Sequence, residues 1–237
     1  MKIMVINPNT SVSMTDHLRK ELVKIKREDT ELTVTCPMVG PVSIESAFDE
    51  ALAVPPTLEL VKKANSEGYD AVILACFSDP GIEAAKEIST IPVVGIQEAT
   101  LHVAAMLGYK FTILTPLQQR VPHKHREVRR YRLEQSMASV RPLGLTVAET
   151  DADPVRTKQR IMEVSRLAAD KDGAEVMVLG CAGMVGYAEE VERELGLVVL
   201  DPSSVALKIC EALVEAKLVH SKRAFFAFPP KKEYKTG

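Results

Sequence analysis

The sequence lacks a long hydrophobic run. None of its apolar stretches approaches the roughly 20 residues that a membrane-spanning helix requires. The first residues lead directly into a strand-like segment, Lys2 to Ile6, without the charged-then-apolar layout of a signal peptide. We therefore expect a cytoplasmic protein with no membrane partner.

A strong excess of charge is also absent. The formal net charge is −2, which gives no general field for attracting nucleic acid or an anionic membrane. The one local exception is the segment 124–132, where Lys124 and four arginines crowd a single expected helix. We interpret this segment as a solvated helix face or a subunit contact, and we expect no nucleic-acid partner.

Cysteine is scarce, and its spacing excludes the common zinc motifs. The four cysteines are Cys36, Cys76, Cys181 and Cys210, and none stands in a CxxC or CxH arrangement. The five histidines show no metal spacing either, so we expect no metal site. A reducing compartment would keep all four cysteines as free thiols.

What the sequence does contain is an alternation of apolar strands and amphipathic helices. With 237 residues, 46% hydrophobic and 26% charged, it is long enough to bury a sizeable core. Continuous apolar runs of this kind are typical of parallel strands covered on both faces. The expected strands are Ile3 to Ile6, Ala71 to Ala75, Val93 to Ile96, Phe111 to Leu114, Val176 to Leu179 and Leu197 to Leu200. Between them, Leu18, Leu22 and Ile25 recur at helical spacing after a cap at Ser13 or Thr15. The pattern predicts a parallel α/β fold.

The chain also repeats itself. The segments Asp70 to Pro80 and Ala174 to Met184 each read as a strand, a small residue and a cysteine, and the two cysteines stand 105 positions apart (181 minus 76). We therefore expect two pseudo-symmetric lobes, each a parallel sheet flanked by helices. The first comprises residues 1–97 plus 202–237 and the second comprises residues 98–201. Because ligands bind at the carboxyl ends of parallel strands, both cysteines would face a cleft between the lobes.

Cys76 and Cys181 are the candidate catalytic residues. Each is expected between a strand end and a helix start, where free amide groups and the helix dipole can lower the pKa of a thiol. Two opposed thiols suit the inversion of a stereocentre beside a carbonyl, since one removes a proton from one face and the other returns a proton to the opposite face. Cys36 and Cys210 lack this context, and we interpret both as structural.

Several polar residues near the strand ends are candidates for binding the substrate. The backbone amides after each cysteine are placed to bind a developing oxyanion, and so are the side chains of Asn7, Thr10, Ser78 and Thr115. The loop after residue 40 can supply a lid or further amides. The full set of predicted binding residues is Asn7, Thr10, Ser43, Ile44, Phe77, Ser78, Thr115, Ala182 and Gly183.

These segments together resemble the hydantoin racemases, including allantoin racemases, within the aspartate/glutamate racemase superfamily. The resemblance rests on the sequences INPNTS at 6–11, GP with SIES at 40–46, CFSDPG at 76–81 and GCAGM at 180–184. It implies a cofactor-independent racemase that acts on a 5-substituted hydantoin or allantoin. It also implies catalytic roles for Cys76 and Cys181 and a homo-oligomer.

The sequence departs from the family at Ser78, where glycine is expected, and this leaves the identity of the substrate open. Amino-acid racemases of the superfamily typically follow the first cysteine with Asn-Thr and the second with Thr. Here those positions hold Phe77-Ser78 and Ala182, which favours an apolar, neutral ring.

Other functions stay open at this point. A cysteine-dependent isomerase or an amino-acid racemase of the same superfamily would have the same fold. The decarboxylases of the superfamily use a single catalytic thiol, so the presence of both Cys76 and Cys181 counts against that activity. A non-catalytic two-lobe ligand-binding protein also matches the pattern. A redox switch through a disulfide between Cys76 and Cys181 would require Cα atoms within about 7 Å.

Overall fold

The computed structural model describes residues 1–232, with Asp151 described by its backbone only. The last five residues of the predicted first lobe, 233–237, lie outside the described residues. The described chain alternates strands and helices throughout.

The first half of the chain builds one four-stranded parallel sheet. Its strands are β1 (Lys2–Ile6), β2 (Glu31–Thr35), β3 (Ala71–Leu74) and β4 (Val93–Gly95), in the order β2-β1-β3-β4. β1 and β3 are the two central strands, and all four described residues of β3 are buried.

The second half builds a second sheet with the same topology. Its strands are β5 (Phe111–Thr115), β6 (Met137–Pro142), β7 (Val176–Leu179) and β8 (Val198–Leu200), in the order β6-β5-β7-β8. β7 therefore takes the place in this sheet that β3 takes in the first. The predicted pair of pseudo-symmetric α/β lobes is confirmed.

Helices cover both faces of each sheet, as the continuous apolar strands require. α1 and α9 cover one face of the first sheet, and α2 and α3 cover the other. α7 and α8 cover one face of the second sheet, and α4 and α5 contact the other. The helices are α1 (Val12–Ile25), α2 (Ala47–Ser66), α3 (Ile82–Ile88), α4 (Ile96–Leu107), α5 (Val121–Arg130), α6 (Val147–Ala152), α7 (Pro154–Asp172), α8 (Ala188–Leu195) and α9 (Pro202–Glu215).

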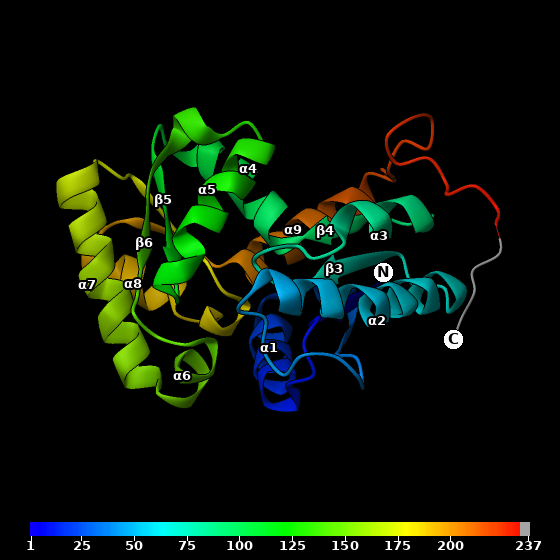
Figure 1. Ribbon diagram of the computed structural model, residues 1–237, viewed down its shortest axis with the longest axis horizontal. Helices are drawn as coiled ribbons and strands as arrows, with labels where there is room; N and C mark the ends of the chain where they lie inside the picture. The colour runs from blue at the N-terminus through cyan, green and yellow to red at the C-terminus, as the bar shows by residue number, and fades with distance from the viewer. Residues whose placement is uncertain (233–237) are drawn as a thin grey trace.

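The two lobes lie side by side, and α9 returns from the second to the first (Figure 1). Glu211 of α9 accepts hydrogen bonds from the amide of Arg27 and the hydroxyl of Thr30 in the first lobe, at 2.8 and 2.9 Å. α4 packs against α9 and also against β7 of the second lobe. The division of the chain at 97/98 and 201/202 stays a proposal.

Two details differ from the sequence analysis. The cap of α1 lies two or four residues earlier than the expected Ser13 or Thr15, because Ser11 caps the helix by accepting a hydrogen bond from the amide of Met14 at 3.2 Å. β2 and β6 were not among the six expected strands. Both lie at sheet edges and are only partly buried, so neither has a continuous apolar run.

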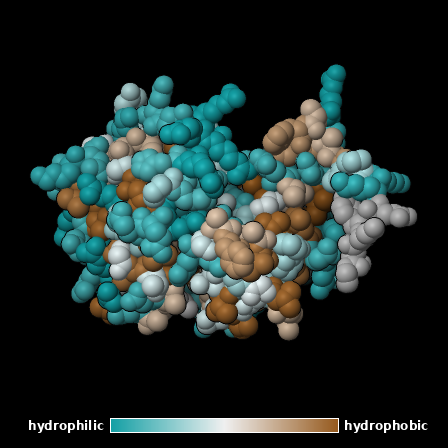
Figure 2. Space-filling view, in the orientation of Figure 1, coloured by the Kyte–Doolittle hydropathy of each residue, from teal (hydrophilic) through white to brown (hydrophobic). Residues whose placement is uncertain are grey.

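The surface combines hydrophilic and apolar regions. Among the described helices, none is long and apolar enough to cross a membrane. Figure 2 shows apolar surface gathered over the beginning of α2. Exposed apolar side chains in and before this region are Met38, Val39, Val42, Phe48 and Leu52.

Candidate active site

A cavity lies where the carboxyl ends of β3 and β7 meet, and both candidate cysteines line it. Cys76 and Cys181 each stand two residues past the end of their strand, so the repeat places their thiols equivalently. The empty space of the cavity, counted out to its mouth, is about 530 Å³. Its lining consists of Asn9, Met14, Ile44, Ala75, Cys76, Phe77, Ser78, Thr115, Pro116, Leu117, Arg120, Lys124, Val147, Gly180, Cys181 and Ala182.

The structure brings most of the predicted site residues together. Seven of them line the cavity: Ile44, Cys76, Phe77, Ser78, Thr115, Cys181 and Ala182. Ile44 comes from the loop before α2. The carboxylate of neighbouring Glu45 accepts a hydrogen bond from the amide of Val147 in the second lobe at 3.0 Å, so this loop bridges the two lobes beside the cavity.

The other four predicted binding residues, Asn7, Thr10, Ser43 and Gly183, lie outside the lining. The Asn7 side-chain amide donates to Asn9 Oδ1 at 2.8 Å and to Thr15 Oγ1 at 3.0 Å, so it orients Asn9, which does line the cavity. Thr10 donates through its amide and hydroxyl to the Pro41 carbonyl. Direct contact of these four side chains or amides with a substrate stays a prediction.

The environment of Cys76 differs from the one expected. α3 begins only at Ile82, so Cys76 does not stand at a helix N-terminus, and the amides of Ser78 and Asp79 donate to the Cys76 carbonyl oxygen. Those two amides are therefore not free to bind a substrate oxyanion. Burial raises the pKa of the Cys76 thiol to about 11, although the Ser78 hydroxyl and the Lys124 ammonium oppose this. In the free protein Cys76 is a thiol at neutral pH.

Cys181 is also buried but has a different set of neighbours. It immediately precedes a short 3₁₀ turn, Ala182–Met184. Burial raises the pKa of the Cys181 thiol, and the Gly183 amide and the charge of Lys124 lower it. The expected lowering of the pKa of both thiols is therefore wrong for the free protein, in which burial raises both.

Lys124 is a site residue that sequence analysis interpreted as part of a solvated helix face or a subunit contact. Its side chain is only 4% exposed, and it lines the cavity. The ammonium donates to the Phe77 carbonyl oxygen and to Gln97 Oε1, the latter at 3.2 Å. Burial lowers the pKa of Lys124 to about 8, and the nearby Cys76 sulfur raises it. At least one residue of the basic segment 124–132, Lys124, therefore lines the candidate active site.

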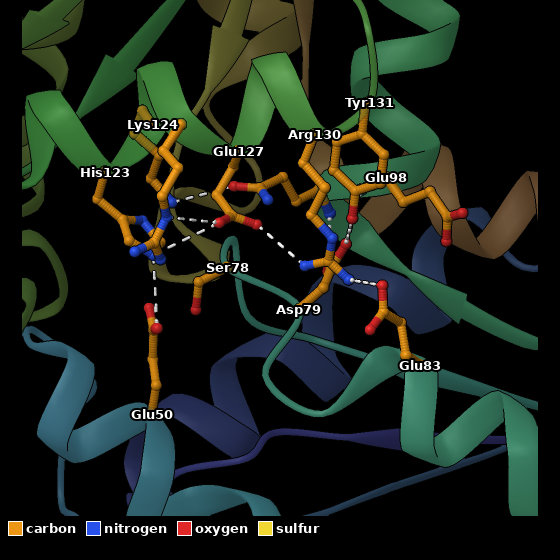
Figure 3. Close-up of polar contacts among 12 residues, drawn as sticks. Glu50, Ser78, Asp79, Glu83, Glu98, His123, Lys124, Glu127, Arg130 and Tyr131 are labelled. Carbon is orange, nitrogen blue, oxygen red and sulfur yellow. Dashed lines mark hydrogen bonds and ion pairs between the residues drawn. The ribbon is translucent and has the colours of Figure 1, made fainter.

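The same face of α5 holds a network of ion pairs over the loop that carries Cys76 (Figure 3). Arg120, just before α5, pairs with Glu50 of α2, and His123 Nε2 lies 3.5 Å from Glu50 Oε2. Burial raises the pKa of Glu50, but hydrogen bonding and charge from His123 and the charge of Arg120 together lower it to about 2. The Ser78 side chain also lowers the pKa of this carboxylate.

The far end of the loop is held by Asp79. Its carboxylate accepts hydrogen bonds from the amides of Gln97 and Glu98 at the start of α4, at 3.0 and 2.7 Å, and lies 3.3 Å from the Tyr131 hydroxyl (Figure 3). Asp79 itself has φ 44°, a left-handed conformation that is costly for a residue other than glycine. The Cys76 loop is therefore fixed by specific contacts.

Sequence analysis missed Asn9, Met14, Leu117, Arg120, Lys124 and Val147 among the main side chains of the lining. For Lys124 the sequence did contain a sign of burial. The apolar residues Val121 and Val128 lie one turn before and one turn after it on the same helix face. Within the described residues, no three His, Cys, Asp or Glu side chains are grouped so as to hold a metal ion.

Comparison with known proteins shows which family this sequence and fold resemble. A sequence model described as Asp/Glu/Hydantoin racemase matches residues 3–210. A hydantoin racemase from Pseudomonas sp. (strain NS671) is 36% identical over 234 residues, covering 99% of this chain and 94% of the relative. The solved allantoin racemase from Klebsiella pneumoniae matches with a TM-score of 0.96 at 36% identity, covering 100% of this chain and 96% of that one. An allantoin racemase from Pseudomonas fluorescens matches with a TM-score of 0.95 at 34% identity, covering 100% of both chains.

Proposed function

Since the chain belongs to the Asp/Glu/hydantoin racemase family and is an isomerase of the racemase type, we propose that its substrate is a 5-substituted hydantoin or allantoin. We propose further that it works without a cofactor, through Cys76 and Cys181. The observation that carries this proposal is the pair of thiols at equivalent positions of two duplicated lobes, both lining one cavity.

The proposed reaction is a two-base proton transfer. The thiolate of one cysteine takes the proton from the ring carbon next to the carbonyl, and the electron pair of the broken C–H bond moves onto the carbonyl oxygen. The thiol of the other cysteine then gives its proton to the opposite face, and the carbonyl re-forms. The product is the mirror-image ring, and the protonation states of the two cysteines have exchanged.

Lys124 supplies the charge that this reaction needs. Its buried ammonium acts on both thiols and lowers the pKa of each, so it stabilises whichever thiolate forms. A fixed positive charge in a site shielded from water also stabilises the negative charge that develops on the carbonyl oxygen. We assign Lys124 this electrostatic role.

The charge balance of the cavity supports a neutral substrate. Arg120 is paired with Glu50. In the reacting state one cysteine is a thiolate, and its charge balances that of Lys124, so no unpaired cation is then left to attract the carboxylate of a free amino acid. The apolar side chains of Met14, Ile44 and Val147 offer a surface for the substituent of the ring.

Optical rotation tests the proposed activity. An enantiopure 5-substituted hydantoin, and separately allantoin, should lose optical rotation faster with the protein than without it. Cys76→Ser and Cys181→Ser should each abolish racemisation, whereas Cys210→Ser, which changes a buried thiol outside the cavity, should retain it. Racemisation that survives in both active-site variants would contradict the two-thiol mechanism.

Cofactor independence and assembly are tested separately. The rate should be unchanged after dialysis against a chelator and gel filtration, because the proposed chemistry uses only side chains of the protein. A rate that falls and is restored by a metal ion would contradict this. We also propose a homo-oligomer, as the family resemblance implies, and light scattering in solution gives its mass.

A further inference from the structure

Within the described part of the chain, the lining of the cavity holds two cationic side chains and no carboxylate. The cations are Arg120 and Lys124, and the side chain of Arg120 is only 12% exposed. Positive charge of one sign around a cavity ordinarily attracts anions. The selectivity of this cavity therefore depends on the groups that stand behind its wall.

The countercharge of Arg120 comes from α2. Arg120 Nη2 pairs with Glu50 Oε1 and donates to His123 Nδ1 at 3.1 Å, and His123 Nε2 lies 3.5 Å from Glu50 Oε2. The three side chains form a closed triangle, and Figure 3 shows Glu50 extending from α2 toward His123 of α5. Burial raises the pKa of Glu50, but His123 and Arg120 together lower it to about 2, so the carboxylate is ionised at neutral pH.

Glu50 balances this charge without lining the cavity itself. Its side chain lines a separate hollow on the outer side of the wall, together with His123. The two arginines of that hollow, Arg126 and Arg130, pair with Glu127. A molecule in the cavity therefore meets the guanidinium of Arg120 but not the carboxylate of Glu50.

A charge-balanced guanidinium can still bind a neutral oxygen. The group carries five N–H donors, and the contacts with Glu50 and His123 involve one of its nitrogens, Nη2. The other donors suit a carbonyl oxygen on the substituent of the ring. A carboxylate at the same place would lose its water without gaining a free countercharge, and such burial is costly.

We propose that Glu50 determines specificity: it cancels the charge of Arg120, so that the site takes rings with a neutral, carbonyl-bearing substituent and rejects rings with an acidic one. Glu50 acts through Arg120 and is a positioning residue. The inference rests on the proposed function and adds to it the class of substituent on the ring. The ureido group of allantoin belongs to the accepted class.

Two rings that differ in charge but not in shape test the proposal. 5-Carboxymethylhydantoin is anionic at pH 7, and 5-carbamoylmethylhydantoin is its neutral counterpart. Loss of optical rotation gives the ratio of kcat/KM for the acid to kcat/KM for the amide. Glu50→Gln leaves Arg120 unbalanced, so this ratio should rise by about tenfold or more, the usual effect of one hydrogen bond to a charged group. An unchanged ratio overturns the proposal.

Variants of Arg120 show whether the gain depends on that side chain. Glu50→Gln combined with Arg120→Met removes both charges, so the ratio should return to about the wild-type value. Arg120→Met alone leaves the charge of Glu50 unbalanced, and its ratio should fall below that of the wild type. A ratio that stays high in the double variant contradicts the assignment. The effect of Glu50 on the pKa of Cys76 applies to both rings and cancels in the ratio.

Glu59→Gln is the matched control. Glu59 is an exposed glutamate of α2 that pairs with Lys62 at 2.7 Å, so its variant should keep the wild-type ratio. Circular dichroism should show every variant folded. If the wild type does not racemise the amide, the proposed function fails and the inference with it. If it racemises the amide but Glu50→Gln leaves the ratio unchanged, the specificity proposal alone is wrong.

Discussion

Burial raises the pKa of both thiols in the cavity, and few side chains lower it. For Cys76 the opposing side chains are Ser78 and Lys124, and Lys124 also acts on Cys181. Such burial has a use, because a thiolate that does form in a site shielded from water is a stronger base than an exposed one. Lys124 therefore decides at which pH the thiolate becomes available.

Replacing Lys124 with methionine should move the activity to higher pH. The ammonium lowers the pKa of the Cys76 thiol, so its removal raises that pKa, and the rising limb of kcat/KM against pH shifts in the alkaline direction. At pH 7, below the pKa of about 8 for Lys124, the ammonium is mostly present, and we expect its loss to lower kcat/KM by about tenfold or more, since one pKa unit is a factor of ten.

The pH profile of kcat/KM for the wild type, Lys124→Met and Lys20→Met measures this shift. Lys20 is exposed on α1 and serves as the matched control, with no change expected. A profile of Lys124→Met that is lower in amplitude but unshifted would mean that Lys124 has no effect on the thiol.

Sequence analysis identified Cys76 and Cys181 because each follows an apolar strand and a small residue in one of the two repeated segments. It misplaced Lys124 because a run of basic residues on a helix is usually solvated. The burial of Lys124 depends on the Phe77 carbonyl and Gln97, which stand 47 and 27 residues away from it in the sequence. Local spacing cannot reveal such a contact.

At the scale of elements, the junction between the Cys76 loop and α4 is the part that holds the site in place. Asp79 accepts hydrogen bonds from two amides at the start of α4. These amides belong to the first turn of a helix, where the backbone offers them no partner. The same contacts keep Asp79 in its left-handed conformation.

Asp79→Ala should therefore reduce both stability and activity. Leaving the buried amides of Gln97 and Glu98 without acceptors costs about 1–3 kcal/mol of the free energy of unfolding. The loop then loses its anchor, and kcat/KM should fall by about tenfold or more, as expected for small displacements of catalytic groups.

Urea denaturation and kcat/KM of Asp79→Ala, compared with Asp153→Ala, separate the two effects. Asp153 caps α7 by accepting a hydrogen bond from the amide of Arg156, outside the cavity lining. Its variant should lose about 1 kcal/mol of stability and keep its activity. If both variants lose stability equally and neither loses activity, Asp79 does not position the site.

The sequence predicted all four central strands and the edge strands β4 and β8, but not the edge strands β2 and β6. β1, β3, β5 and β7 are apolar throughout or nearly so because helices cover both of their faces. The edge strand β2 reads ELTVT and β6 reads MASVRP, which mixes polar and apolar residues. Strands with such a mixed pattern are specified mainly by their pairing with a neighbour, which a local pattern does not contain.

At the scale of the whole molecule, the two lobes share one apolar core. Ile3, Val5 and Ile73 of the first sheet belong to the same buried cluster as Phe111, Ile113, Val176 and Val178 of the second. α4 and α9 pack against each other between the sheets. Although the repeat divides the chain into two lobes, the packing joins them.

We therefore expect the two lobes to unfold together. In native-state hydrogen exchange, the slowest amides of β3 and of β7 should exchange with the same free energy of opening, and that energy should match the global free energy of unfolding. Different free energies for the two strands would show that each lobe unfolds on its own.

The central claim is that Cys76 and Cys181 serve opposite faces of one substrate carbon. Proton NMR of each enantiomer of a 5-substituted hydantoin in D2O, corrected for spontaneous exchange, tests it directly in Cys76→Ser and Cys181→Ser. Each variant keeps one base, so each should exchange the ring proton of one enantiomer and not of the other, with the preference reversed between the two variants. Exchange of both enantiomers by a single variant would contradict the account.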